Sequence, residues 1–206
     1  MIKRVAVLLD GGFVQKRLFF RQGKQMPTAQ EILDFAHTCV GPDEELFRIY
    51  YYDCPPFSGT LTHPVSGETE DYSQTEVFAA RTALIDEIAQ ADYVAFRPGV
   101  LTAAGWKLRY TSQKALAKST RTCTVNDFVP DWAQKRVDMN IGLDVAWLAS
   151  KGIVDRIILV SADTDFIPAM EFARREGVQV VIVPMDSSTL SKSLRANADE
   201  VREVKV

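Results

Sequence analysis

The sequence is poor in the residues that build disulfide frameworks and zinc sites. Its 206 residues include only three cysteines, Cys39, Cys54 and Cys123, and two histidines, His37 and His63. An odd number of widely spaced cysteines does not form a disulfide framework, and these residues show none of the ligand spacings of zinc sites. We therefore expect free thiols in a reducing cytoplasm.

Long apolar runs and a large charge of one sign are also missing. No stretch approaches the length of a membrane-spanning helix, and the apolar run at residues 5–9 is too short for a signal peptide, so we expect a cytoplasmic protein without membrane contact. The 24 basic and 27 acidic residues give a formal charge of −3, which argues against a protein that coats nucleic acid by its overall charge. A chain of 206 residues, 47% of them hydrophobic, can bury one sizeable core, and we expect a single domain over residues 1–206.

Apolar runs of strand length alternate with amphipathic stretches of helix length. Strands are predicted at residues 5–9, 45–52, 93–98, 106–111, 156–160 and 178–183. Helices are predicted at residues 28–40, 71–91, 137–150 and 166–176. This alternation predicts an α/β fold with a central, mostly parallel sheet flanked by helices.

Aspartates follow two of the predicted strands. Asp10 ends the run at residues 5–9, and Asp163 and Asp165 come shortly after the run at residues 156–160. Functional groups of open parallel sheets gather beyond the carboxyl ends of the strands, so these carboxylates face one cleft if the two strands are neighbours. An aspartate at a strand-to-helix junction is also often only a helix N-cap, and for Asp163 or Asp165 alone that interpretation is equally good.

Further acidic residues lie in the predicted helix at residues 137–150. Asp138 is in its first turn, where the helix dipole favours an anion. Asp144 lies roughly 120° around the helix from Asp138, so we rank it lower as a direct metal ligand. Clustered carboxylates repel one another unless a cation neutralises them, and oxygen ligands favour Mg²⁺ or Mn²⁺. Such an ion activates water for the hydrolysis of a phosphodiester.

One stretch of the chain carries basic residues and no acidic ones. Its cations are Lys107, Arg109, Lys114, Lys118 and Arg121. They could bind phosphates while Trp106 and Tyr110 stack on bases. Lys135 and Arg136, just ahead of Asp138, could contact the phosphate that a metal ion engages. For both groups, solvated surface charge is an equally good interpretation.

Three segments taken together resemble the acidic motifs of the NYN domain, in the LabA-like branch of the PIN-like nucleases. They are residues 5–13, residues 135–138 followed by Asp144, and residues 161–166. The resemblance implies a PIN-like three-layer fold and a metal-dependent endoribonuclease that hydrolyses single-stranded or structured RNA with Mg²⁺ or Mn²⁺. It assigns catalysis to Asp10, Asp138, Asp163 and Asp165. It assigns metal binding to Asp10, Asp138 and Asp163, with Asp144 in support.

Several alternatives remain open at this point. Phe13 departs from the family pattern, because many NYN domains carry an asparagine there, and a polar contact that positions substrate is lost. A catalytically silent module that binds RNA or a protein on the same fold is therefore the alternative function, and a homodimer is also open. Toprim and haloacid-dehalogenase folds are disfavoured, because the first needs a glutamate where Asp10 stands and the second needs an aspartate where Gly12 stands.

Overall fold

The computed structural model describes residues 2–118, 120–186 and 190–204. The chain divides into two compact units, which are described separately. The first comprises Met1–Asp53, Leu84–Gly99 and Arg136–Val206, and the second comprises Cys54–Ala83 and Val100–Lys135. A division into units does not decide whether each folds alone, so the single domain stays a prediction.

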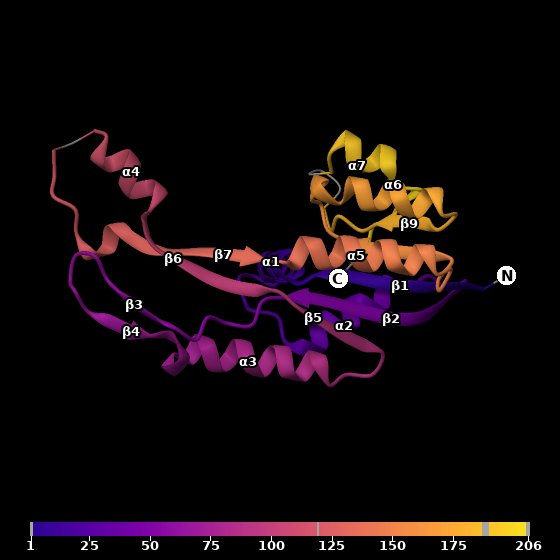
Figure 1. The fold of residues 1–206 in the computed structure, drawn as a ribbon, viewed down its shortest axis with the longest axis horizontal. Helices are drawn as coiled ribbons and strands as arrows, with labels where there is room; N and C mark the ends of the chain where they lie inside the picture. The colour runs from indigo at the N-terminus through magenta and orange to yellow at the C-terminus, as the bar shows by residue number, and fades with distance from the viewer. Residues whose placement is uncertain (1, 119, 187–189, 205–206) are drawn as a thin grey trace. The chain divides into compact units, whose positions relative to one another are not determined.

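A six-stranded sheet forms the centre of the first unit (Figure 1). Its strand order is β10-β9-β8-β1-β2-β5, and every neighbouring pair is parallel. The strands are β1 (Lys3–Asp10), β2 (Glu44–Asp53), β5 (Val94–Pro98), β8 (Arg156–Val160), β9 (Gln179–Ile182) and β10 (Glu200–Val201). The apolar run at residues 5–9 is fully buried in β1, at the middle of the sheet.

Helices cover both faces of this sheet. The helices of the first unit are α1 (Gly11–Arg21), α2 (Ala29–Thr38), α5 (Val137–Ser150), the short η3 (Thr164–Phe166), α6 (Ile167–Arg175) and α7 (Lys192–Asn197). Val5, Val7 and Leu9 of β1 share a core with α1 and α2. Alternate side chains of a strand point to opposite faces of a sheet. Tyr51 packs in the core with α1 and α2, whereas the next residue, Tyr52, points to the other face and donates a hydrogen bond to Asp144 of α5. Helices therefore lie above and below the sheet, as in a three-layer α/β fold.

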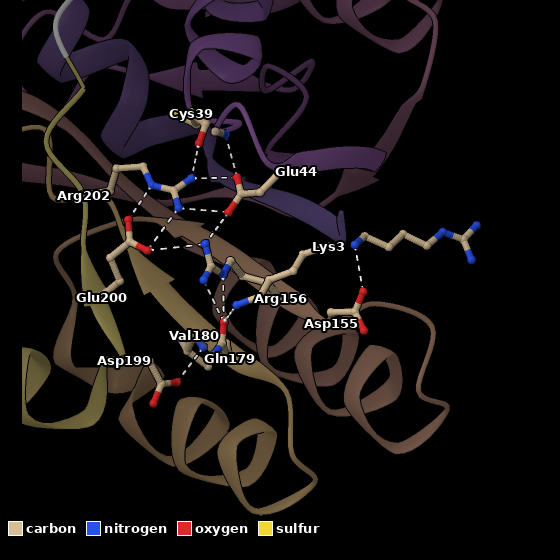
Figure 2. A network of polar contacts seen from close by, with 12 residues as sticks. Lys3, Cys39, Glu44, Asp155, Arg156, Gln179, Val180, Asp199, Glu200 and Arg202 are labelled. Atoms are coloured by element: carbon tan, nitrogen blue, oxygen red, sulfur yellow. Dashed lines mark hydrogen bonds and ion pairs between the residues drawn. The ribbon is translucent and has the colours of Figure 1, made fainter. Parts of the chain in front are cut away.

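Charged side chains tie the amino ends of the strands together (Figure 2). The carboxylate of Glu44, at the start of β2, accepts hydrogen bonds from Arg202 at 2.8 and 2.9 Å and from Arg156 at the start of β8. Glu200 of β10 accepts a further bond from Arg202 at 2.7 Å. Burial alone would raise the pKa of Glu44, but the hydrogen bonds from Arg202, Gly41 and Arg156 lower it to about 2. We call Glu44, Arg156, Glu200 and Arg202 the amino-end cluster.

The second unit is built from two antiparallel strand pairs. Strand β3 (Thr60–Thr62) pairs with β4 (Thr69–Asp71), and β6 (Val100–Leu108) pairs with β7 (Phe128–Lys135). Its helical segments are η1 (Tyr72–Gln74), α4 (Tyr110–Leu116), η2 (Val125–Asp127) and the beginning of α3 (Glu76–Ala89), which continues into the first unit. Aromatic side chains pack on one another in this unit, with the rings of Phe57, Tyr72 and Trp132 in mutual contact.

The predicted α/β fold with a mostly parallel central sheet is confirmed. Two predicted elements differ. The strand expected at residues 106–111 is correct only to Leu108, because β6 covers Val100–Leu108 and α4 begins at Tyr110. The helix expected from residue 71 begins at Glu76, because the Asp71 side chain caps η1 and the Thr75 side chain accepts a hydrogen bond from the Phe78 N–H.

Candidate functional site

Two adjacent strands carry the first aspartates of the site. Strands β1 and β8 pair in parallel with Leu9 opposite Val160, so the predicted adjacency of these two strands is confirmed. Asp10 is the last residue of β1, and Ser161 and Asp163 follow β8 directly. The carboxyl ends of the two central strands therefore deliver these side chains to one edge of the sheet.

Asp10 is held at the corner between β1 and α1. Its side chain caps α1 by accepting a hydrogen bond from the Phe13 N–H at 3.1 Å, and it accepts a second from the Ser161 hydroxyl at 3.4 Å. The corner needs glycine, because a Cβ on Gly11 would lie 2.6 Å from the carbonyl oxygen of Tyr52. The Asp-Gly pair thus starts a helix at once, and the Asp10 carboxylate stays at the sheet edge.

Ser161 links the two strand-end aspartates. Its hydroxyl donates to Asp10 and accepts a hydrogen bond from the backbone N–H of Asp163 at 3.2 Å, and the residue is 1% exposed. Asp163 in turn caps η3 by accepting from the Asp165 N–H at 2.9 Å. Sequence reasoning missed Ser161, although a small polar residue between a buried strand and Asp163 was a usable signal.

Asp138 approaches the same edge from the beginning of α5. It is the second residue of the helix and follows Arg136, whose backbone is left-handed with φ of 75°. Burial raises the pKa of the Asp138 carboxyl, and the charges of Asp163 and Asp165 raise it further. We call Asp10, Asp138, Asp163 and Asp165 the carboxyl-end cluster.

Burial and neighbouring negative charges disfavour the ionised forms of Asp10 and Asp138. Burial raises the pKa of Asp10 to about 6, and the charges of Asp138 and Asp163 add to this, while the hydrogen bonds from Phe13 and Ser161 oppose it. Like charges in a shared, partly desolvated site raise pKa values in this way unless a cation compensates them. The arrangement is therefore electrostatically suited to a positively charged partner.

The donor set is compatible with a hard divalent cation. In the described part of the chain, no group of three or more His, Cys, Asp or Glu side chains stands ready to hold a metal ion. Mg²⁺ does not require such a cage, because it keeps several water ligands and is usually held by one or two carboxylates together with substrate phosphates. Aspartate oxygens on two neighbouring strand ends fit that mode of binding.

Asp144 lies elsewhere, on the face of α5 that packs on the sheet. It is 4% exposed, and its carboxylate accepts hydrogen bonds from the Tyr52 hydroxyl at 2.9 Å and from Arg97, which binds both of its oxygens. The structure thus pairs Asp144 with an arginine and does not bring it into the carboxyl-end cluster. Its angle around the helix from Asp138 had already indicated this separation.

A second buried acid adjoins the site and was missed in the sequence. Asp53, the last residue of β2, is 1% exposed and accepts hydrogen bonds from Gln15 at 2.7 Å and Tyr51 at 3.1 Å. These contacts join α1 to the end of β2, next to the residue pair Asp10 and Tyr52. We assign Asp53 a positioning role, because its carboxylate accepts hydrogen bonds from Gln15 and Tyr51 of the same corner.

The basic stretch of the second unit is partly neutralised. Lys107 forms an ion pair with Asp131 at 2.6 Å, and Arg121 binds Asp127 through two hydrogen bonds. Lys114 lies over the ring of Tyr110, 4.4 Å from its centroid. Lys107 and Arg121 are therefore weaker candidates for phosphate contacts than the sequence indicated. The contacts of Arg109, Lys114, Lys118, Lys135 and Arg136 with nucleic acid stay predictions.

The fold and the site together define a PIN-like α/β protein with an acidic edge. The family model of the NYN domain matches residues 73–205, which is more than half of the chain, and the chain belongs to the NYN domain family. The matched range contains Asp138, Asp163 and Asp165, whereas Asp10 precedes it. The narrower resemblance to the LabA-like branch stays a prediction.

Solved structures add support for the fold alone. A protein of unknown function from Vibrio parahaemolyticus superposes with a TM-score of 0.54 at 16% sequence identity, covering 98% of this chain and 93% of its own. No curated protein matches the chain. None of the helices in the described ranges has the length and hydropathy needed to cross a bilayer.

Proposed function

We propose that the protein is a metal-dependent ribonuclease that hydrolyses RNA phosphodiester bonds at the carboxyl-end cluster. One observation carries the proposal. Carboxylates from the ends of β1 and β8 and from the start of α5 lie within electrostatic reach of one another, and burial together with the charges of Asp138 and Asp163 raises the pKa of Asp10 to about 6. Membership of the NYN family, which has a nuclease-like fold, supports the same reaction class.

Asp10, Asp138 and Asp163 would hold Mg²⁺ or Mn²⁺, and Asp165 would act beside them on the water or the leaving oxygen. A bound divalent cation supplies an activated water and stabilises charge on the phosphate oxygens. The Ser161 hydroxyl keeps the Asp10 and Asp163 segments in register. Asp144 is left out of this set, because Arg97 and Tyr52 already occupy its carboxylate.

RNA is the proposed substrate because the chain belongs to the NYN domain family and because the second unit carries an exposed aromatic side chain beside a cation. Tyr110 is 68% exposed and lies beside Lys114, a pairing that suits base stacking together with phosphate contact. We propose action in the cytoplasm, because the free thiols of Cys39 and Cys123 suit a reducing compartment. Both single-stranded and structured RNA are proposed substrates.

A silent RNA-binding or protein-interaction module is the second candidate, and Phe13 favours it. Where many family members have a polar asparagine, this chain has a phenyl ring with the Arg17 guanidinium 5.3 Å from its centroid. The ring also packs against the core and offers no hydrogen bond to a substrate. A silent RNA-binding module would differ from the nuclease in turnover and not in the ability to bind RNA, whereas a protein-interaction module would neither cleave nor bind RNA.

A cleavage assay separates them. A 5′-labelled single-stranded RNA is incubated with Mn²⁺, with Mg²⁺ or with EDTA, and the parent protein is compared with Asp10→Asn and Asp163→Asn. Asparagine keeps both N-caps, so these variants remove charge without removing the cap. We expect a loss of at least about a hundredfold in rate, and no loss in the control Glu171→Gln, an exposed acid on α6. Cleavage that persists in EDTA or in both variants would refute the mechanism, and binding without cleavage would favour the silent module.

A further inference from the structure

A groove of about 510 Å³ lies in the first unit, between α5 and the strands β2 and β5. Seven residues line it: Arg48, Tyr50, Ala95, Arg97, Leu143, Asp144 and Trp147. The small side chain of Ala95 leaves room beside the helix. Its volume falls in the range of roughly 300–1,000 Å³ typical of ligand sites in proteins.

The lining combines aromatic rings with a net positive charge. Trp147 is 49% exposed, while Tyr50 is 5% exposed and lies at the base of the groove. The pair of Arg97 and Asp144 is neutral, so Arg48 leaves the lining with an excess of one positive charge. An exposed indole beside guanidinium groups is suited to a ligand that has both a π face and a negative charge, such as a nucleotide.

The groove and the carboxyl-end cluster share one helix. Asp138 stands in the first turn of α5 and Trp147 in its third turn, a separation of roughly 13 Å along the axis at about 1.5 Å per residue. Arg97 and Asn140 lie between the cluster and the groove. The Asn140 side chain donates a hydrogen bond to the carbonyl oxygen of Pro98, the residue after Arg97 in β5. Asp138 and Trp147 are nine residues apart, so at about 100° per residue they lie on opposite sides of α5. A strand of RNA at the cluster would therefore reach the groove by passing around the beginning of α5.

We propose that this groove binds a nucleotide of single-stranded RNA several nucleotides away from the one being cleaved, with its base on Trp147 and its phosphate at Arg48. The inference rests on the proposed function, because it takes the carboxyl-end cluster as the place of cleavage. The exposed apolar residues Met139 and Leu143 on α5 also suit a second copy of the chain. A two-fold interface centred on the groove would, however, bring Arg48 of each copy toward the other, and like charges oppose such a contact.

Binding is measured with a fluorescein-labelled 12-nucleotide oligouridine RNA and protein carrying Asp163→Asn, so that no cleavage interferes. We expect Trp147→Ala to weaken binding about tenfold. Arg48→Ala should weaken it too and lower the slope of log affinity against log salt by about 0.7, the value for one phosphate contact on a single strand. Met139→Ala, an exposed residue of the same helix outside the lining, should leave both quantities unchanged.

Tryptophan fluorescence gives a second, direct readout. With Trp106→Phe and Trp132→Phe, Trp147 is the last of the three tryptophans, and we expect the RNA to quench its emission by stacking. If that variant does not fold, the loss of quenching in Trp147→Phe of the otherwise unchanged protein reports the same contact. Unchanged affinity in both Trp147→Ala and Arg48→Ala would overturn the inference, as would a dimer that Trp147→Ala dissociates while RNA binding persists.

The two proposals fail in different ways. If the parent protein cleaves RNA but neither groove variant alters binding, the groove is wrong and the nuclease stands. If the parent protein cleaves nothing in Mn²⁺ or Mg²⁺ but Trp147 is still quenched by RNA, the nuclease is wrong, and the groove remains a binding site on a silent module.

Discussion

The two ends of one parallel sheet treat acidic side chains in opposite ways. At the amino ends, Glu44 lies between two arginines, and its pKa falls to about 2. At the carboxyl ends, burial raises the pKa of Asp10 to about 6, and the charges of Asp138 and Asp163 contribute to the rise. The amino-end cluster therefore stabilises the fold through ion pairs within the chain. The carboxyl-end cluster instead keeps negative charge that a bound cation can compensate.

The largest expected effect on stability comes from breaking the amino-end cluster with Glu44→Gln. The change leaves Arg156 and Arg202 without their shared, buried carboxylate, and we expect the free energy of unfolding to fall by about 3–5 kcal/mol. Urea denaturation at pH 7 measures it, with Glu45→Gln, an exposed neighbour on β2, as the control. A loss below about 1 kcal/mol would mean that the cluster behaves like a surface ion pair.

The pH dependence of Glu44 has a definite sign. Its pKa is lowered from 4.5 to about 2, so its contribution to stability is complete above pH 4.5 and is lost as the pH falls toward 2. The Glu44→Gln variant should therefore differ most from the parent protein at neutral pH and converge with it at the acid end.

At the other end of the sheet, Asp10→Asn should stabilise the protein. The pKa of Asp10 is raised from 3.8 to about 6, so its favourable contribution is complete below pH 3.8 and is lost as the pH rises through 6. Asparagine carries no charge and still caps α1, and we expect a gain of about 2 kcal/mol at pH 7.5 and none at pH 3.5. Thermal unfolding in EDTA at both pH values measures it. An equal effect at the two pH values would contradict the origin in charge.

The smallest of the three effects sharpens the position of Asp144. Tyr52→Phe removes one hydrogen bond to its buried carboxylate while Arg97 remains, and we expect a loss of about 1–2 kcal/mol in the free energy of unfolding. Because Asp144 stands outside the carboxyl-end cluster in our account, Mn²⁺ affinity should not change. Exposed Tyr93→Phe is the control. A loss of Mn²⁺ affinity in Tyr52→Phe alone would place Asp144 in the metal site.

The parts that the sequence predicts well are those with strong local signals. The nearly uninterrupted apolar runs at residues 156–160 and 178–183 form β8 and β9, and the helix expected at residues 137–150 has those bounds. The positions of Asp10 and Asp163 after neighbouring strands followed from the general behaviour of parallel sheets, and the pairing of β1 with β8 confirmed that the strands are neighbours.

The rest depends on contacts between residues that are distant in the chain. Gly11 begins α1 where a Cβ would collide with the carbonyl oxygen of Tyr52, and no local pattern in the sequence reveals that contact. The sequence indicates that Lys107 and Arg121 could bind phosphates, whereas in the fold they form ion pairs with Asp131 and Asp127. No local pattern reveals that Arg202 forms an ion pair with Glu44, since the two residues are 158 positions apart.

The central claim is that the carboxyl-end cluster holds a divalent cation, and Mn²⁺ binding tests it most directly. Isothermal titration of the parent protein with Mn²⁺ at pH 7.5, paired with the shift in its melting temperature, is compared with the same measurements on Asp163→Asn and on the control Glu171→Gln. We predict that Mn²⁺ binds and stabilises the parent protein and Glu171→Gln, because a ligand that prefers the native state raises its stability, and that Asp163→Asn loses most of both effects. Equal binding by Asp163→Asn and the parent protein, or no binding by the parent protein, would contradict the account.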